Sequence, residues 1–159
     1  MSNVLGIIKS NIIVILTAML PVVELRGAIP VGIALGIPPI EATILSIIGS
    51  TLPVPFILFF IKYIFKWLSK FEKTNKLIEK ITSKAMKKSD SIAKYEFWGL
   101  LLFVGIPLPG TGAWTGSLIA SLLGMKNKVA IPAIFLGNVL AGTIVYLLSY
   151  TTINIFNFF

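Results

Sequence analysis

A run of residues without any charge, 97–125, has at its centre the stretch Gly105-Ile-Pro-Leu-Pro-Gly-Thr-Gly-Ala-Trp-Thr-Gly116. The run is long enough for a helix to cross the hydrocarbon core of a bilayer, which takes about 20 apolar residues. Pro107 and Pro109 each remove an amide donor and push the preceding residue out of helical conformation. The sequence therefore predicts a helix that is broken near its middle rather than one straight span.

The break leaves two short helical arms, 97–106 and 113–125. At about 1.5 Å per residue, each arm covers roughly half of a bilayer. The two arms therefore fit a re-entrant hairpin. Lys126 and Lys128 follow the second arm, and a hairpin that returns to the cytoplasm keeps both lysines inside, as membrane proteins prefer.

The composition is that of an integral membrane protein built from helices. Hydrophobic residues make up 56% of the chain and charged residues 13%, whereas soluble domains have about 25% charged residues. Two further runs, 42–61 and 129–159, are also free of charge. Cysteine and histidine do not occur, which excludes disulfides and the common zinc and haem ligands. We predict an all-α fold that holds no metal and no cofactor.

The first part of the chain has the same form as the second. An apolar arm, Asn3–Leu20, leads into a break at Pro21–Gly27, and a short second arm, Ala28–Gly36, follows. Residues 42–61 then form a spanning helix, and the two prolines within it are expected to kink it. We therefore expect a re-entrant hairpin followed by one span in this half too.

The two halves match when the chain is compared with itself at a separation of 88 residues. Pro21 then pairs with Pro109, Gly36 with Gly124 and Gly49 with Gly137. One half begins outside the membrane and the other inside, so we predict an inverted-topology repeat, which points to a transporter with a site at the midplane. The predicted organisation is one membrane domain, 1–159, with a first repeat (1–61), a linker (62–96) and a second repeat (97–159).

The linker contains most of the charge of the chain. Ten of the 14 basic residues lie between Lys62 and Lys94, and the linker 62–96 also contains four acids. On a helix the lysines share one face and apolar residues the other, so 62–96 is predicted to be a basic amphipathic helix on the cytoplasmic lipid surface. Recognition of nucleic acid or of one lipid headgroup is an alternative role, but an anchor that fixes topology is favoured.

Glu24 and Arg26 are the charges that stand out. No other charge occurs between Lys9 and Glu41, and a charge at the bilayer centre costs about 3 kcal/mol or more. An anionic substrate would bind Arg26 and compete with Glu24, whereas a cationic substrate would bind Glu24. Glu24 can also carry the coupling proton. The alternative is a structural ion pair that holds the break.

Irregular backbone at membrane depth is tolerated only where it is buried in protein or lines water. The two breaks are therefore predicted to line a common site with backbone groups, hydroxyls and one large ring. The alternative for the hydroxyls is that they cap and pack the next helix. The predicted lining residues are Pro21, Gly27, Pro30, Pro107, Pro109, Gly110, Thr111, Gly112, Trp114, Thr115 and Asn138.

Two motifs carry a resemblance that covers nearly the whole chain. Pro21-Val-Val-Glu-Leu-Arg-Gly-Ala-Ile-Pro30 and the Gly105–Gly116 stretch resemble the small multi-drug export protein family, which is distantly similar to the DedA family of membrane proteins. The resemblance implies two facing re-entrant loops that carry acidic and arginine residues, and proton-dependent transport of lipid-linked phosphates. The second motif departs from the DedA pattern because it contains no charge.

The predicted function is that of a small secondary transporter or lipid translocase, coupled to protons and working as a homodimer in a prokaryotic plasma membrane. It would move an amphipathic or lipid-phosphate substrate and bind no nucleic acid. The chain lacks a phosphate-binding Gly-x-x-x-x-Gly-Lys-Ser/Thr loop, so ATP hydrolysis is not expected. A membrane enzyme would need clustered carboxylates or a histidine. The chain has no histidine, and its first half offers only Glu24 and Glu41, so an enzyme is not expected. A pore-forming or scaffold protein without a specific substrate is the remaining alternative.

Overall fold

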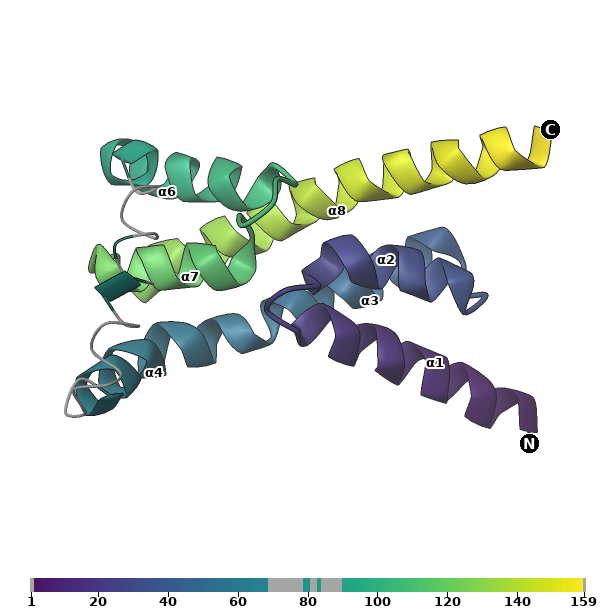
Figure 1. Ribbon diagram of the computed structural model, residues 1–159, viewed down its shortest axis with the longest axis horizontal. Coiled ribbons are helices and arrows are strands. Elements are labelled where there is room, and N and C mark those ends of the chain that lie inside the picture. Colours follow the sequence, from purple (N-terminus) through teal and green to yellow (C-terminus); the bar gives the residue numbers. More distant parts are fainter. Residues whose placement is uncertain (1, 69–78, 81–82, 84–89, 159) are drawn as a thin grey trace.

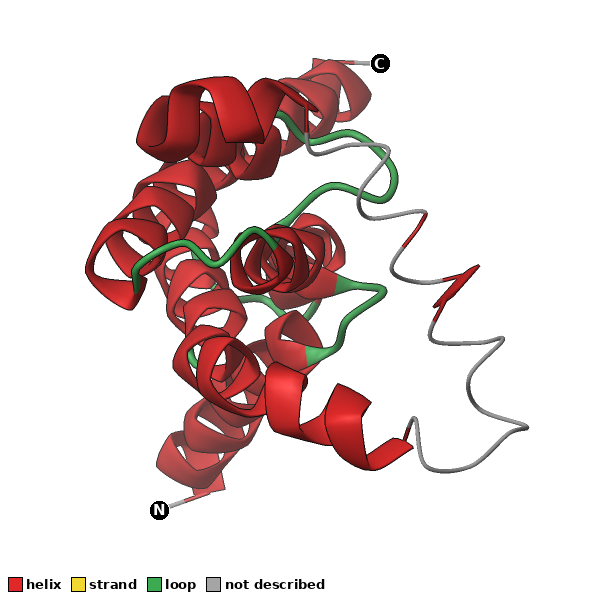
Figure 2. Cartoon of the chain, turned by 90° about the vertical axis from the view of Figure 1, so that its left-hand side faces the viewer, coloured by secondary structure: helices red, strands yellow, loops and turns green. Residues whose placement is uncertain are grey.

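The computed structural model describes residues 2–68, 79–80, 83 and 90–158, and this part contains helices and loops but no strand (Figure 2). The prediction of an all-α fold is thus confirmed. The helices are α1 (Ser2–Met19), α2 (Glu24–Ala34), α3 (Pro39–Thr51), α4 (Pro53–Leu68), α6 (Asp90–Gly105), α7 (Ala113–Leu122) and α8 (Asn127–Phe158).

Two helical hairpins face each other along the long axis of the molecule. Helices α1 and α2 form the first hairpin and α6 and α7 the second, and their tips meet near the middle (Figure 1). Helices α3 and α4 lead from the first hairpin to the other end, and α8 runs the whole length in the opposite direction (Figure 1). Each half therefore consists of a hairpin followed by a long helical segment.

The second break lies where the prolines predict it, but the first is shorter than predicted. Helix α2 already begins at Glu24, because the amides of Glu24 and Gly27 donate to the carbonyls of Leu20 and Val23 at 3.0 and 3.1 Å. The predicted break at Pro21–Gly27 is wrong in its second part, since only Pro21 in it lacks an amide hydrogen. The motif proline Pro30 lies inside α2 and is exposed.

The long segment after the first hairpin is kinked as predicted. Helix α3 ends at Thr51 and α4 begins at Pro53. Pro53 and Pro55 have no amide hydrogen for the carbonyls of Gly49 and Thr51, so the regular helix is interrupted there. By length and apolar composition, Pro39–Ile61 and Asn127–Thr151 could each cross a membrane.

The same turn ends α2 and α7. Gly36 and Gly124 have φ of 82° and 69°, the left-handed conformation that favours glycine after a helix. The amide of Gly36 donates to the Ile33 carbonyl and that of Ile37 to Gly32. In the second half, bonds from Gly124 to the Ser121 carbonyl and from Met125 to Ala120 lie at the same 88-residue separation.

Each hairpin is packed by parts of both halves. The first core joins α1, α2 and the start of α3 through Val14, Ala28 and Ala42, and the middle of α8 packs on α2 through Val145. The second core joins α4, α6, α7 and the start of α8. Helix α4, which follows the first hairpin along the chain, thus packs on the second hairpin, and α8, which follows the second hairpin, also contacts the first. The fully buried members of the second core are Val54, Leu100, Val104, Ala113, Ile119, Ala120, Ala130, Ala133 and Ile134.

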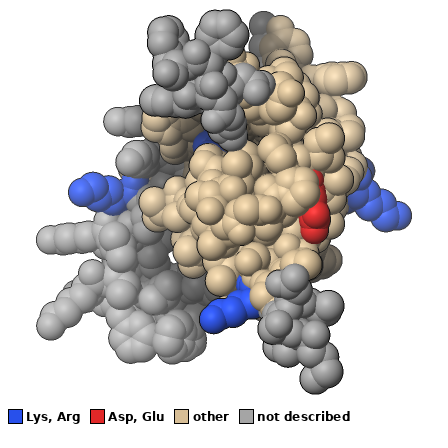
Figure 3. Space-filling view, turned by 90° about the vertical axis from the view of Figure 1, so that its right-hand side faces the viewer, with Lys and Arg blue, Asp and Glu red and all other residues tan. Residues whose placement is uncertain are grey.

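Large apolar side chains cover much of the outer surface. Val22, Phe56 and Trp98 are 92%, 66% and 65% exposed, and similar residues follow α1, α3, α4 and α8. Seen from the end that carries the start of α1 and the end of α8, the described surface is mostly uncharged (Figure 3). Soluble proteins rarely expose apolar surface on this scale, so together with the two apolar spans it indicates a membrane protein.

The predicted amphipathic helix at 62–96 lies largely outside the described residues. Helix α4 continues through its first part to Leu68, and α6 begins near its end at Asp90. Helix α6 is kinked at Glu96, where φ is 38° and ψ is −99°. The hydrophobic arm that the sequence predicts from residue 97 thus starts directly after this kink.

Candidate functional site

Glu24 stands at the first position of α2, at the tip of the first hairpin, and its carboxylate faces Gly112 and Trp114 of the second hairpin. Its φ of 49° is in the left-handed region, which a residue with a side chain adopts only at a conformational cost. The carboxylate is bonded to the guanidinium of Arg26 in the next half turn, with 2.7 Å between Oε2 and Nη1. The Glu24 side chain is 5% exposed and that of Arg26 21%.

Arg26 bridges the two hairpins. Its Nη1 donates to the carbonyl of Thr111 at 3.0 Å, and its Nη2 donates to the Thr111 hydroxyl at 3.0 Å and to the Ile106 carbonyl at 3.4 Å. These acceptors lie in the second break, where backbone carbonyls are left outside a regular helix. The hydroxyl of Thr111 reaches back to the carbonyls of Ile106 and Leu108 at 2.9 and 2.8 Å and so fixes the loop around the guanidinium.

The second oxygen of Glu24 caps a helix of the other hairpin. Glu24 Oε1 accepts a hydrogen bond from the amide of Trp114, in the first turn of α7, at 3.0 Å. Helix N-termini carry unpaired amides and a partial positive charge, so they favour an anion at this position. The indole of Trp114 donates to the Met19 carbonyl at 3.0 Å, which adds a contact to the end of α1. We call Glu24, Arg26, Thr111 and Trp114 the tip network.

Gly112 leaves the space in which the carboxylate lies. Its φ is 127°, and an added Cβ would collide with Glu24 Oε2 and lie 2.6 Å from Arg26 Nη1. At the separation of 88 residues, Gly112 is the counterpart of Glu24 and Trp114 that of Arg26. One half thus provides the side chain and the other half the space for it.

Most of the remaining predicted site residues lie near the tips but outside the tip network. Pro21, Pro109 and Gly110 are exposed in the two breaks, and Pro107 and Thr115 are partly buried. Gly27 lies within α2, where an added Cβ would meet Val23. Their part in a site stays a prediction.

Asn138 is buried in the middle of α8, between the two halves rather than at the tips. Its Nδ2 donates to Thr51 Oγ1 at 3.0 Å, so its described bond joins α8 to the end of α3. Ser50, which corresponds to Asn138 at a separation of 88 residues, is buried too, and its hydroxyl has no hydrogen-bond partner in the described part of the chain. The structure therefore places Asn138 in an interhelical contact.

An apolar groove of about 600 Å³ opens beside the tip network. It is lined by α6 and the second break, and two of its residues, Ile106 and Thr111, also hold Arg26. Trp98, Leu102 and Phe103 provide most of the apolar wall. A groove of this size and composition can accommodate the apolar body of a small ligand whose polar group reaches the network.

Sequence reasoning predicted that backbone groups of the breaks line the site and included Gly112, but it did not predict which backbone groups take part or that Gly112 leaves space for the Glu24 carboxylate. Carbonyls carry no residue-type signal, so the acceptors at Met19 and Ile106 were not predictable individually. The pairing of Glu24 with Gly112 could have been predicted from the comparison of the chain with itself, because the 88-residue separation that aligns Pro21 with Pro109 also aligns these two positions. Among the described residues, no three His, Cys, Asp or Glu side chains are grouped to hold a metal ion.

A family model described as "putative small multi-drug export protein" matches residues 24–144. The matched range begins at Glu24 and includes the second break, the start of α8 and its contact with α3. Neither a curated protein nor a solved structure matches the chain.

Proposed function

The chain belongs to the small multi-drug export protein family, and we propose that it is a secondary transporter whose substrate site lies between the two hairpin tips. The observation that carries this proposal is the tip network itself. In an otherwise apolar membrane protein, a buried carboxylate and the single arginine of the chain connect the two hairpins. Ionisable groups at such depth are expensive and mark substrate or proton pathways by default.

We further propose that the two halves form an inverted-topology repeat with re-entrant hairpins. Three features support this: the two hairpins come from opposite ends of the molecule and meet at their tips (Figure 1), the turns after α2 and α7 share their hydrogen bonds at a separation of 88 residues, and Pro21 of the first break aligns with Pro109 of the second. Repeats of this kind build sites at the midplane and allow access to alternate between the two sides.

Glu24 is the proposed coupling group. Its carboxylate is shared between Arg26 and the N-terminus of α7, and both partners favour the ionised form. A proton on the carboxylate would remove the negative charge from both contacts: the ion pair with Arg26 would be lost, and the hydrogen bond from the Trp114 amide would keep roughly half of its strength. The contact between the two tips would weaken, and the hairpins would be free to move apart. Protonation and substrate binding would thus act on the same contact.

The substrate is proposed to be amphipathic. Its apolar body would lie in the groove beside Trp98, and its polar group would reach the tip network through Ile106 and Thr111. An anionic group, such as a lipid phosphate, would take the place of the Glu24 carboxylate at Arg26 and the α7 amides. A cationic group would instead bind Glu24 and displace Arg26.

The surroundings of the site are also part of the proposal. We expect the chain to act in a prokaryotic plasma membrane, with 62–96 in the cytoplasm and without binding nucleic acid or catalysing a reaction. Two hairpins and two spans enclose little volume, so a homodimer is expected. The distant similarity to the DedA family stays a prediction.

A structural role for the ion pair is the competing account, and it fits a pore-forming or scaffold protein. It is favoured by the number of backbone acceptors around the guanidinium, which hold Arg26 firmly between the hairpins. However, Arg26 Nε is buried without a hydrogen-bond partner in the described part of the chain. Buried unpaired donors are few in proteins, and a substrate that accepts a hydrogen bond from Nε would account for this one.

Transport into proteoliposomes decides between these accounts. Candidate drugs and polyprenyl phosphates would be assayed with and without a pH gradient, with wild type, Glu24→Gln and Arg26→Ala. We expect wild type to transport at least one of them and both variants to lose about tenfold or more, equivalent to about 1.4 kcal/mol. Glu79→Gln, at an exposed carboxylate in the linker, serves as the matched control. Normal transport by both tip variants would show that the site assignment is wrong.

A further inference from the structure

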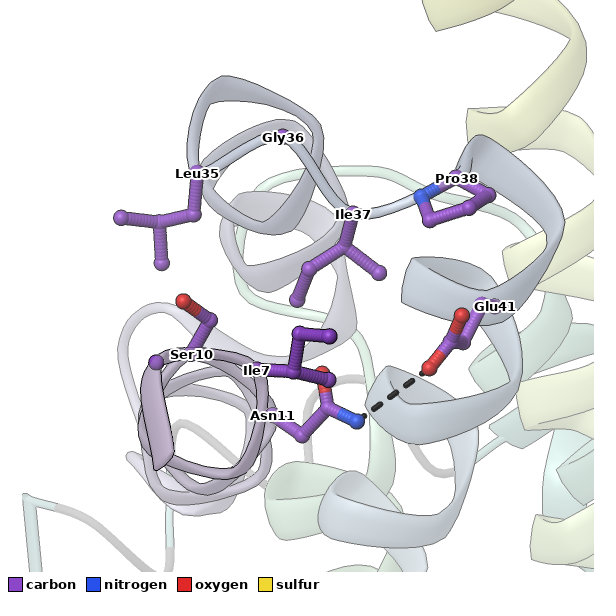
Figure 4. Close-up of a pocket in the computed structure, with 9 residues that line it drawn as sticks. Ile7, Ser10, Asn11, Leu35, Gly36, Ile37, Pro38 and Glu41 are labelled. Atoms are coloured by element: carbon purple, nitrogen blue, oxygen red, sulfur yellow. Dashed lines mark hydrogen bonds between the residues drawn. The ribbon is translucent and has the colours of Figure 1, made fainter. Parts of the chain in front are cut away.

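A second pocket, far from the hairpin tips, lies between α1 and the turn that joins α2 to α3 (Figure 4). Its volume is about 470 Å³, within the usual range for small-molecule sites. Ile7, Leu35 and Ile37 give it apolar walls, and Ser10, Asn11 and Glu41 give it a polar side. We call it the turn pocket.

The polar side of the turn pocket presents hydrogen-bond acceptors. Asn11 Nδ2 donates to Glu41 Oε1 at 3.2 Å (Figure 4). This bond fixes the orientation of the amide, since only its nitrogen can donate to a carboxylate. Asn11 Oδ1 is consequently directed away from Glu41, and it is buried without a hydrogen-bond partner in the described part of the chain. A buried acceptor in this state calls for a donor from outside the chain.

The charge of the pocket has one sign. Glu41 is exposed and forms no ion pair among the described residues, and no lysine or arginine lines the cavity. Lys9 lines a separate apolar surface on α1. The chain as a whole carries a net charge of +8, so a negative pocket is not a consequence of its composition.

The equivalent turn in the second half lacks this chemistry although its backbone is the same. At the separation of 88 residues, Val129 replaces Glu41, and Lys126 and Lys128 replace Pro38 and Ile40. The acidic pocket is therefore a property of the first half alone. A role for Glu41 in stabilising the first turn of α3 accounts for the carboxylate but leaves the buried Asn11 oxygen unexplained.

We propose that the turn pocket binds an amphipathic ammonium ion that carries N–H donors. One N–H would be donated to Asn11 Oδ1 and another to the Glu41 carboxylate, while an aromatic or aliphatic body would lie against Ile7, Leu35 and Ile37. The ligand needs N–H donors because the polar side of the pocket offers acceptors, and it needs a positive charge because one of these acceptors is the Glu41 carboxylate. This site is separate from the tip network, and its binding does not depend on transport.

Equilibrium binding of dansylcadaverine, a fluorescent aryl alkyl primary amine, to the full chain in nanodiscs of uncharged lipid tests the proposal. We expect saturable binding, and a loss of about tenfold in affinity for Glu41→Gln and for Asn11→Leu, as for hydrogen bonds to charged groups. The N-acetylated, uncharged probe should bind about tenfold more weakly or worse. The N-trimethylated probe keeps its charge but has no N–H on that nitrogen, so Asn11→Leu should leave its affinity unchanged.

Glu79→Gln is the control variant, since it removes an exposed carboxylate of the linker and should bind the amine like wild type. Glu41→Gln and Asn11→Leu are used together so that a folding defect in one of them does not decide the result, and circular dichroism verifies that both variants are folded. Equal affinity of wild type and Glu41→Gln, equal affinity for the acetylated probe, or partition into the bilayer without saturation would each overturn the proposal. Saturable binding without any transport would contradict the proposed function and leave this inference standing.

Discussion

The two hairpin tips correspond to each other at a separation of 88 residues but have opposite chemistry. The first tip contributes Glu24 and Arg26, whereas the second contributes Gly112 and Trp114 at the corresponding positions. Because the tips meet, two carboxylates at corresponding positions would lie side by side and repel each other. The comparison shows that a pair of similar backbones forms one site when one half carries the charge and the other half offers space, amides and carbonyls.

The turns after α2 and α7, at the far ends of the hairpins, also share their backbone conformation and differ in their charged residues. Gly36 and Gly124 share their conformation and hydrogen bonds, yet the first turn leads to Glu41 and the second is flanked by Lys126 and Lys128. Backbone geometry is thus repeated along the chain while charge is not. The lysines match the predicted cytoplasmic side, and the absence of Lys and Arg from the first turn matches the opposite side.

The largest effect is expected when the space at the second tip is filled. In Gly112→Ala the new Cβ would collide with the Glu24 carboxylate, and alanine would have to adopt a φ of 127°. We expect a loss of about 4 kcal/mol or more in the free energy of unfolding. The measurement is unfolding in mixed micelles by increasing SDS, followed by circular dichroism.

Two further variants sharpen that result. Gly6→Ala adds a methyl group where nothing lies within 4 Å, so it should not lower stability, and the higher helix propensity of alanine within α1 should raise it by up to about 1 kcal/mol. Combining Gly112→Ala with Glu24→Ala removes the colliding carboxylate and should restore part of the loss, because the two residues are in contact. Strictly additive losses would contradict the account that Gly112 exists to accommodate Glu24.

A somewhat smaller effect is expected when the charge of the first tip is left without its partner. Arg26→Ala removes the bonds to the Thr111 and Ile106 carbonyls and leaves the buried Glu24 carboxylate unpaired. Breaking a buried pair in this way costs about 3 kcal/mol. Thermal unfolding should show this loss, and Arg26→Ala with Glu24→Gln should recover part of it. An unchanged midpoint for Arg26→Ala would show that the guanidinium does not hold the tips together.

Equal losses of stability are expected at Gly49 and Gly137, which correspond to each other at a separation of 88 residues and are both closely packed. An added Cβ at Gly49 would lie 2.6 Å from the Ile15 carbonyl, and one at Gly137 would lie 2.7 Å from Val104 Cβ. Each alanine variant should lose about 2 kcal/mol in the free energy of unfolding, as overpacked sites do. A large loss in one variant and none in the other would show that the helix crossings of the halves are not equivalent.

The smallest effect is expected at the indole of Trp114. Trp114→Phe keeps the ring in place and removes the hydrogen bond to the Met19 carbonyl. We expect a loss of about 1 kcal/mol in the free energy of unfolding, the usual value for one such bond. The bond from the Trp114 amide to Glu24 is retained in this variant, so transport should persist. Loss of transport in Trp114→Phe would assign the indole a direct role in transport.

The sequence predicts the larger part of this fold because prolines and uncharged runs act locally. Pro107 and Pro109 locate the second break, and the prolines after Leu52 locate the kink between α3 and α4. The extent of the first break was predicted less well, since Glu24 and Arg26 read as a polar interruption although their amides continue into a helix. Charge indicates where a site lies, but it does not decide whether the backbone there is helical.

The candidate site was predictable in its charged residues, and Thr111 and Trp114 were among the predicted lining residues, but the groups of the second break that meet the ion pair were not predictable. Glu24 and Arg26 stand out because no other charge surrounds them. Their partners are the Thr111 and Ile106 carbonyls and the Trp114 amide, and such groups occur at every position of a chain. Which of them meet the ion pair depends on how the two hairpins face each other, and that is a tertiary property.

The orientation of the two halves is the central claim, and single cysteines test it most directly. The chain has no cysteine, so Ile40→Cys and Lys128→Cys, at exposed and corresponding positions of the two turns, can each be labelled with a membrane-impermeant maleimide in intact cells and in inverted vesicles. We predict that position 40 reacts only from outside and position 128 only from the cytoplasm. Labelling of both positions from the same side would contradict the inverted arrangement and, with it, a site formed between opposed hairpin tips.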